Sequence, residues 1–193
     1  MPAPARVETC WGLVPPEMAA YHDHQWGIPC HDDRKLFEML MLEGFQAGLS
    51  WSTILARRES FRRAFDDWDV ERIAAYGPDD IARLMADPGI IRNRLKVEGA
   101  IKNARAFLEA CEEHGAFDPY IWSFVGGAPL DRPAPESFEQ VPATTPESDI
   151  MSRALKKRGF TFVGSTICYA FMQAVGMVND HLASCPARTR LTR

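Results

Sequence analysis

The chain has 193 residues, of which 46% are hydrophobic and 25% are charged, and its formal net charge is −4. This composition is that of an ordinary globular protein, long enough for a well-packed domain, and it excludes collagen-like and disordered chains. No stretch of about 18 residues is continuously apolar, and residues 1–11 lack an apolar segment of signal-peptide length, so we expect a cytoplasmic protein without a membrane-spanning helix.

Helical patterns dominate the chain. Asp32 and Asp33 supply an N-cap for a helix in which Leu36, Met39 and Leu40 recur at helical spacing. Further helices are expected at residues 50–65, 69–76, 79–86, about 90–114, 120–125, 146–158 and 165–180. Gly and Pro residues predict a turn at 87–89 and a surface loop at 126–146, and residues 160–163 are expected to be extended without forming a sheet. We therefore predict an all-α fold in which residues 1–193 form a single domain.

The charge is unevenly distributed along the chain. Residues 150–193 carry seven basic side chains against the single acid Asp180, and residues 92–105 carry five against Glu98. Two basic segments in an otherwise acidic chain can form a phosphate-binding surface. On the pattern alone, solvated helix faces are the commoner explanation.

Residues 84–96 combine a short helix, a tight turn at Gly89 and a basic helix that contains Arg92, Arg94 and Lys96. The glycine allows a ligand to approach the backbone closely, and unpaired amides at the start of the second helix can bind a phosphate. The pattern therefore predicts a DNA contact without sequence preference, with an ordinary turn between two helices as the commoner alternative.

Glu43 falls on the apolar stripe of its helix rather than on the polar face. A carboxylate there is either a structural residue at the helix end or a buried acceptor kept for a ligand. If the aromatic rings of Tyr21 and Trp51 lie nearby, the site would suit a flat ligand that donates hydrogen bonds and carries positive charge.

The cysteines and histidines suggest a metal site. Five cysteines at irregular spacing do not predict a disulfide framework, and His181 and Cys185 are four residues apart. Together with Cys10 and His22 they would form a closed tetrahedral zinc site, which is structural because no position is left for a substrate. The spacing by itself leaves coincidence open, and His24 competes with His22.

Taken together, several runs of sequence resemble the 3-methyladenine DNA glycosylase I family. They follow one another in the family's order and extend from about Cys10 to Cys185. The run Tyr21-His22-Asp23-His24-Gln25-Trp26-Gly27 is one of them; the others are at residues 36–39, 42–51, 89–94, 122–125, 154–160, 162–169 and 178–181.

The resemblance implies a helix-hairpin-helix fold, with the hairpin at about residues 79–105. It also implies structural Zn²⁺ bound by Cys10, His22, His181 and Cys185, which would join the terminal segments at about residues 10–22 and 181–185. The implied activity is hydrolysis of the N-glycosidic bond of 3-methyladenine in alkylated double-stranded DNA, with 3-methylguanine as a candidate second base. The implied enzyme is a monomer that flips the base out, releases it and leaves an abasic site without cutting the strand.

The resemblance also assigns individual residues. Glu43 would be the catalytic and base-recognising carboxylate, and Tyr21 and Trp51 would bind the extruded base. The DNA-binding residues would be Gly48 and Leu49, at the position where the family wedges the duplex, together with Gly89, Arg92 and Arg94 of the hairpin.

One position departs from the family pattern. The family has a tryptophan two residues after the first zinc cysteine, whereas the order here is Cys10-Trp11-Gly12. Either Trp11 reaches the pocket from a shifted backbone, or one aromatic wall of the pocket differs.

Two other functions compete with the enzyme. One is a lesion sensor that binds damaged DNA without catalysis, which release of free base from methylated DNA would exclude. The other is a zinc protein whose basic segments bind acidic proteins, which a salt-dependent DNA-binding curve would exclude.

Overall fold

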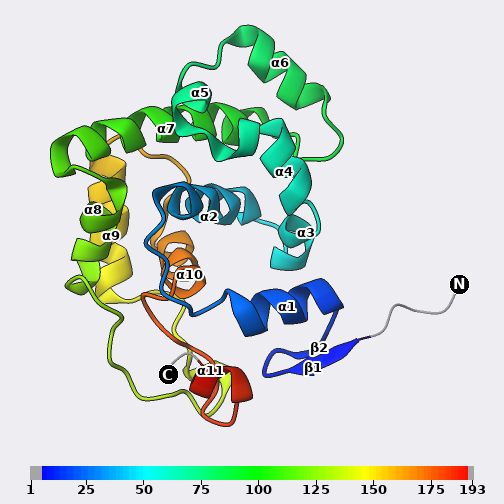
Figure 1. Cartoon of the computed structure of the whole chain (residues 1–193), viewed down its shortest axis with the longest axis vertical. Helices are drawn as coiled ribbons and strands as arrows, with labels where there is room; N and C mark the ends of the chain where they lie inside the picture. Colours follow the sequence, from blue (N-terminus) through cyan, green and yellow to red (C-terminus); the bar gives the residue numbers. More distant parts are fainter. Residues whose placement is uncertain (1–5, 191–193) are drawn as a thin grey trace, which may run out of the picture.

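The computed structural model describes residues 6–190, and their fold is mostly helical (Figure 1). The α-helices are α1 (Pro16–His24), α2 (Asp33–Gln46), α3 (Trp51–Leu55), α4 (Arg58–Ala64), α5 (Val70–Ala74), α6 (Pro78–Ala86), α7 (Arg94–His114), α8 (Phe117–Trp122), α9 (Pro146–Lys157), α10 (Ser165–Ala174) and α11 (Pro186–Arg190). Short 3₁₀ helices are η1 (Asp66–Trp68), η2 (Ser123–Val125) and η3 (Phe138–Gln140). The predicted helical class is thus confirmed. No helix in the described part of the chain is long and apolar enough to cross a bilayer.

A small antiparallel hairpin, β1 (Val7–Thr9) and β2 (Gly12–Val14), is the one addition to this helical fold among the described residues. Its turn is held by the Thr9 hydroxyl, which donates to the Gly12 carbonyl at 3.2 Å and accepts from the Trp11 amide at 3.0 Å. Gly12 has φ +85°, which a residue with a side chain rarely adopts. Each strand has only three residues, which is too few for an alternation of apolar and polar residues to predict a strand.

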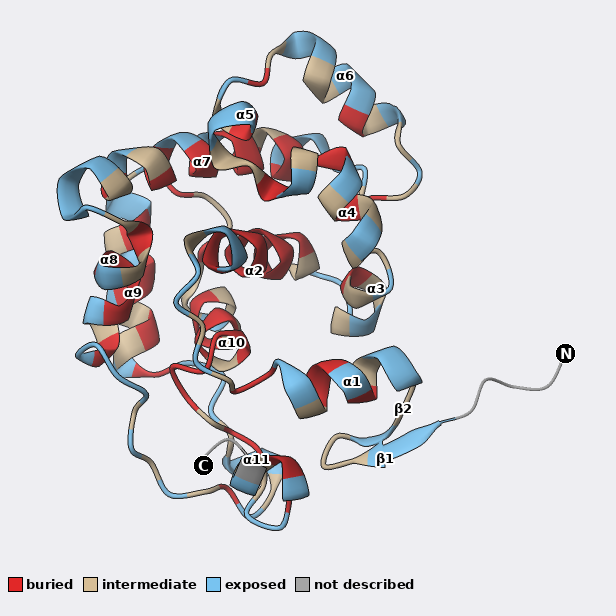
Figure 2. Cartoon of the chain, viewed as in Figure 1, coloured by how far each residue is buried: buried red, intermediate tan, exposed pale blue. Residues whose placement is uncertain are grey.

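Helix α2 lies at the centre of the molecule and is buried from Leu36 to Phe45 (Figure 2). It begins where the sequence predicts, because the Asp32 carboxylate accepts a hydrogen bond from the Lys35 amide at 2.9 Å. Helices α3, α7, α8 and α10 pack around it. A helix enclosed on all sides buries whatever polar groups it carries, so its two central acids, Glu38 and Glu43, are both only 3% exposed.

Helix α7 is the longest element and packs against α2, α5, α6 and α8. It begins at Arg94, not at residues 90–91 as predicted. Asn93 is extended (φ −122°, ψ 112°), and its side chain caps the helix by accepting from the Lys96 amide at 3.2 Å. The helix ends as predicted at Gly115, which is left-handed with φ +83°.

Two other predicted helices are shorter than expected. Residues 50–65 form α3 and α4 with a break at Ala56 and Arg57, and this break allows Arg58 to reach Glu38 of α2 at 2.8 Å. The last predicted helix, 165–180, ends at Ala174. Gly176 is left-handed there (φ +72°) and packs directly against the backbone of Ile28 and Pro29. Helices α1 and α11 were not predicted.

The two ends of the described chain lie together. Helix α1 contacts both the hairpin and α11 at the lower side of the view in Figure 1. The segment after α1 is tied to the end of α10, because the Gly27 amide donates to the Gln173 carbonyl at 2.9 Å and the Cys30 amide to the Val175 carbonyl at 3.1 Å. The hairpin and α1 form a layer that faces α2, α3 and α10 (Figure 1).

The close approach at Gly176 gives a test of this junction. A Cβ at residue 176 would overlap the backbone of Ile28 and Pro29, in addition to the left-handed strain. We expect Gly176→Ala to destabilise the fold by more than the ~1–2 kcal/mol of that strain alone. Gly126→Ala is the matched control, because Gly126 has φ +75° and open space around it. Equal unfolding free energies for the two variants in urea would contradict the role of the junction.

Candidate active site

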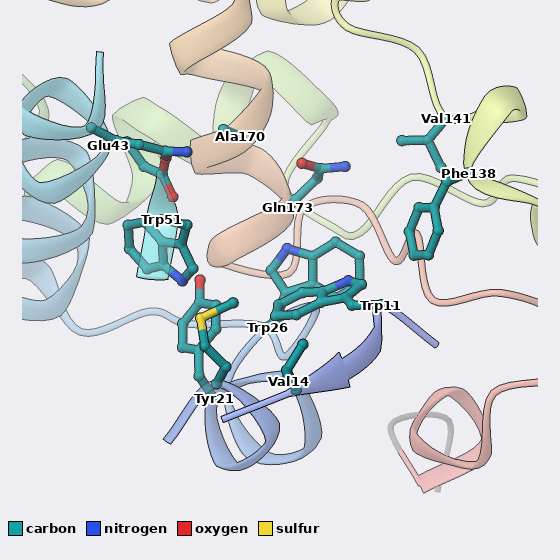
Figure 3. A pocket seen from close by; sticks show the side chains of 12 residues that line it. Trp11, Val14, Tyr21, Trp26, Glu43, Trp51, Phe138, Val141, Ala170 and Gln173 are labelled. Carbon is teal, nitrogen blue, oxygen red and sulfur yellow. The ribbon is translucent and has the colours of Figure 1, made fainter. Parts of the chain in front are cut away.

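A pocket of about 440 Å³ opens between the hairpin layer and the central helices (Figure 3). Its lining comes from segments far apart in the sequence: Trp11, Val14, Met18, Tyr21, Trp26, Glu43, Gln46, Trp51, Phe138, Val141, Ala170 and Gln173. The lining is mostly aromatic and aliphatic with few polar groups, as in a site for a flat small molecule.

Glu43 is the acidic residue of this lining. Its Oε2 atom is buried without a hydrogen-bond partner among the residues that the structure describes. Burial raises the pKa of this carboxyl to about 8, because the ionised form loses its hydration. A buried polar atom without a partner is costly, and beside a cavity it is an acceptor available to a bound ligand.

Tyr21 and Trp51 lie next to Glu43 at one end of the pocket (Figure 3). Their ring centroids are 5.1 Å apart with an interplanar angle of 46°. Burial, reinforced by the nearby Glu43, raises the pKa of Tyr21 well above its usual value, so this hydroxyl keeps its proton. The indole Nε1 of Trp51 is also buried without a partner in the described chain. The structure thus brings together the three residues that the sequence assigned to base recognition.

Trp11 also reaches the pocket. Its ring packs edge-on against Trp26, with centroids 4.8 Å apart, and lies 6.1 Å from Tyr21. At Cys10-Trp11-Gly12, the hairpin turn therefore places the Trp11 indole in the lining of the pocket.

Several lining residues were not predicted. Trp26 belongs to a run already quoted for the resemblance. Ala170 and Gln173 are three residues apart on one face of α10, so a helical pattern could have paired them. Phe138 and Val141 belong to the long loop at residues 126–146, where no sequence pattern indicates which side chains face the pocket. Gln173 is oriented by the protein, because its Nε2 donates to Asp180 at 2.8 Å, which leaves its carbonyl oxygen free to accept.

A second cluster joins the two ends of the described chain. The ligand atoms of Cys10, His22 and Cys185 lie within 4.8 Å of one another, and Cys10 Sγ is 3.0 Å from His22 Nε2. The other ring nitrogen, Nδ1, is 2.7 Å from an Asp23 oxygen, an arrangement that orients a metal-bound imidazole. Two thiols and an imidazole are donors that Zn²⁺ prefers, so these three residues fit the metal that the resemblance implies.

His181 is placed differently from the prediction. Its ring is buried edge-on against that of His22, with centroids 4.6 Å apart. Its Nε2 donates to the His22 carbonyl at 3.0 Å, however, and its Nδ1 is 2.9 Å from the Asn179 side-chain oxygen. Both ring nitrogens therefore contact protein groups, and the structure does not bring them into the three-residue cluster.

Gly48 and Leu49 form an exposed turn directly after α2. Gly48 has φ +79° and open space beside it, and Leu49 is 42% exposed. This turn leads from the helix that carries Glu43 to Trp51 at the start of α3.

The connection between α6 and α7 presents its arginines to solvent. Arg92 and Arg94 are exposed, and Arg94 forms an ion pair with Glu98 at 3.4 Å. The Gly89 amide donates to the Asp87 carboxylate at 2.7 Å, within the turn itself. A Cβ at Gly89 would lie 3.0 Å from that of Ser60, so a side chain here would crowd the packing of the connection against α4.

Comparison with known proteins places these features in a family. A family model described as methyladenine glycosylase matches residues 11–189. The chain is 48% identical over 180 residues to DNA-3-methyladenine glycosylase 1 of Escherichia coli (strain K12), covering 93% of this chain and 96% of that protein. It is 50% identical over 171 residues to DNA-3-methyladenine glycosylase of Haemophilus influenzae, covering 88% and 91%.

The fold agrees as well. The structure of 3-methyladenine DNA glycosylase I from Staphylococcus aureus, solved to explain recognition of 3-methyladenine, superposes with a TM-score of 0.90 at 36% identity, covering 95% of this chain and 97% of that one. This chain therefore belongs to the methyladenine glycosylase family.

The raised pKa of Glu43 predicts how pH affects stability. In the unfolded chain the carboxyl ionises near pH 4.5, whereas in the fold it stays protonated up to about pH 8. The stabilisation is therefore complete below pH 4.5 and is lost as pH rises through 8. With about 1.4 kcal/mol per pKa unit, we expect the wild type to lose a few kcal/mol more than Glu43→Gln between pH 5 and pH 9. Urea unfolding at both pH values measures this difference, and parallel losses would contradict it.

Proposed function

We propose that this protein excises 3-methyladenine from alkylated double-stranded DNA in base-excision repair, by hydrolysing the N-glycosidic bond. The observation that carries the proposal is the buried Glu43 carboxyl, which has an unpartnered oxygen beside an aromatic pocket. The names of the bacterial relatives, and the base that the S. aureus structure was solved to explain, support the same substrate. The products are free base and an abasic site, with no strand cleavage.

The chemistry of the substrate determines what the protein has to supply. Methylation at N3 makes the purine cationic, so its glycosidic bond is already weakened and the base leaves as a neutral molecule. No general acid is needed to protonate the leaving group. The remaining tasks are to find the lesion, flip it out of the duplex and hold it while water attacks the sugar.

Glu43 recognises the positive charge of the base. In the empty pocket its carboxyl is protonated below about pH 8, because burial disfavours the charge. A purine cation in the pocket favours the ionised form, so the carboxyl loses its proton as the base enters. The carboxylate then accepts a hydrogen bond from the exocyclic amine of the base.

The aromatic rings bind a planar ligand by stacking. Stacking of a base on a ring such as Trp51 or Tyr21 contributes about 1–3 kcal/mol. A cationic purine gains a further attraction to the ring faces. Trp11 and Trp26 extend this aromatic wall toward Phe138 and Val141 (Figure 3).

The reaction is monofunctional in this proposal. A glycosylase that also cuts the strand uses an amine nucleophile, and no lysine is among the residues found to line the pocket. Lys96, close by in sequence to the arginines of the hairpin, is held by backbone carbonyls instead. Water is therefore the nucleophile.

DNA is held by the turn and the α6–α7 connection. Leu49 fills the space that the flipped base leaves, and Arg92 and Arg94 neutralise phosphates without reading the sequence. Gly89 shapes the connection. The pair α6 and α7 would correspond to the helix-hairpin-helix element, and the protein acts as a monomer with one domain.

The cluster at the chain ends binds structural zinc. Cys10, His22 and Cys185 fit the metal, and His181 is the fourth ligand if its ring exchanges its present protein contacts for the ion. A bound metal would join the hairpin and α1 to the C-terminal segment. Since Trp11 and Tyr21 lie next to two of these ligands in sequence, the metal would also stabilise one wall of the pocket.

Glu43→Gln is expected to reduce excision by about 100-fold or more, because the amide stays neutral and cannot balance the charge of the base. The measurement is chromatography of the bases that purified protein releases from methylated DNA. Glu109→Gln is the control, because it makes the same change at an exposed position on α7. Equal release by Glu43→Gln and wild type would remove the role of Glu43. No release by wild type would favour a lesion sensor.

Zinc should be present in the purified protein at about one ion per chain. We expect Cys185→Ala to lower both the metal content and the melting temperature, because the terminal segments lose their link. Cys111→Ala is the control, since this half-buried cysteine lies outside the cluster. Elemental analysis and thermal unfolding measure the two quantities. A metal-free wild type with the same melting temperature as a zinc-loaded sample would contradict the proposal.

A further inference from the structure

Lys96 is a buried cation that the proposed chemistry does not use. It lies in the first turn of α7 and is only 8% exposed. Its Nζ donates to the carbonyl of Phe45 at 2.8 Å and to that of Ala47 at 2.7 Å. Both acceptors belong to the last turn and C-cap of α2, a different part of the chain.

These two carbonyls need a partner. The amide of Leu49, which would continue the helical pattern to Phe45, donates instead to the Gln46 carbonyl at 2.6 Å. The turn at Gly48 thus leaves carbonyls at the end of α2 without intrahelical partners. A positive charge is favourable at the C-terminus of a helix, where these carbonyls concentrate negative potential.

The position of Lys96 on its own helix is unfavourable. A cation in the first turn of α7 faces the positive end of that helix dipole. Burial also lowers the pKa of Lys96, because the charged ammonium loses its hydration. An apolar residue would avoid both costs, so the benefit of the lysine lies in its contact with α2.

That contact joins the parts of the protein that the proposed function uses. Phe45 is two residues after Glu43, and Ala47 immediately precedes the Gly48–Leu49 turn. Lys96 itself is two residues after Arg94. A single ammonium group thus connects the DNA-facing arginines, the exposed turn and the helix that carries the carboxylate.

We propose that Lys96 is a positioning residue that fixes the Gly48–Leu49 turn relative to the α6–α7 connection. The inference rests on the proposed function. When Arg92 and Arg94 bind phosphates, Lys96 keeps the Gly48–Leu49 turn at a fixed distance from them. The turn then contacts the duplex where the flipped base can enter the pocket beside Glu43. Binding of a free base does not require this geometry, because the pocket is formed by other contacts.

Lys96→Met tests the inference, because methionine keeps the length and apolar part of the side chain but donates no hydrogen bond. We expect single-turnover excision of 3-methyladenine from DNA to fall between about 10- and 100-fold, the cost of a small misplacement of reacting groups. Binding of free 3-methyladenine, followed by the fluorescence of the pocket tryptophans, should change less than about twofold. Lys96→Arg should restore much of the excision, because a guanidinium also donates to two carbonyls.

Lys102→Met is the matched control, since it removes a lysine from an exposed position of the same helix. Unchanged excision by Lys96→Met would overturn the inference. So would an equal loss of free-base binding and excision, because that result indicates general damage to the fold. If wild type itself releases no base, the proposed function fails rather than this inference.

Discussion

The structure depends on the burial of α2 from Leu36 to Phe45, which forces two glutamates into the interior with opposite outcomes. Burial raises the pKa of a carboxyl, but at Glu38 two arginines, Arg58 and Arg62, outweigh it and lower the pKa below its usual value. At Glu43 there is no such compensation, and the carboxyl remains neutral with a free oxygen. Five residues of one helix therefore separate a structural ion pair from a site suited to a cation. A ligand with a positive charge would stabilise the ionised form of Glu43, as the arginines stabilise the ionised form of Glu38.

In the proposed function, the same helix connects recognition of the base with contact to the duplex. Glu43 lies near its C-terminal end, and the chain turns sharply after Gln46 to present Leu49 to solvent. A helix that is packed on all sides transmits position without bending, so the turn and the carboxylate keep a fixed separation. DNA glycosylases act on a base that has left the stack, and a rigid element of this kind suits an enzyme that must hold both the duplex and the extruded base.

The opposite wall of the pocket is built differently. The hairpin and α1 lie at the edge of the fold, and their contacts with the rest of the described chain include α11, α3 and the end of α10. The Cys10, His22 and Cys185 cluster lies at this edge. Chain ends are the least stable part of most domains. A metal at this cluster would therefore stabilise the terminal segments without taking part in the reaction. The wall that carries Tyr21 and Trp11 is thus the part of the site most sensitive to the terminal segments.

The sequence by itself determined those features that depend on neighbouring residues. The cap at Asp32, the stop at Gly115 and the placement of Glu43 on an apolar stripe are local, and the ordered motifs indicated the family. Only the tertiary structure decided which distant segments meet: Gly176, after the end of α10, packs against Ile28, and Arg58, after the break in residues 50–65, reaches Glu38. It also decided that Trp11 joins the pocket, that Phe138 closes its far side and that His181 turns toward the His22 carbonyl. The physical reason is that backbone capping acts over three or four residues, whereas a pocket wall or a ligand cluster results from contacts between segments more than a hundred residues apart.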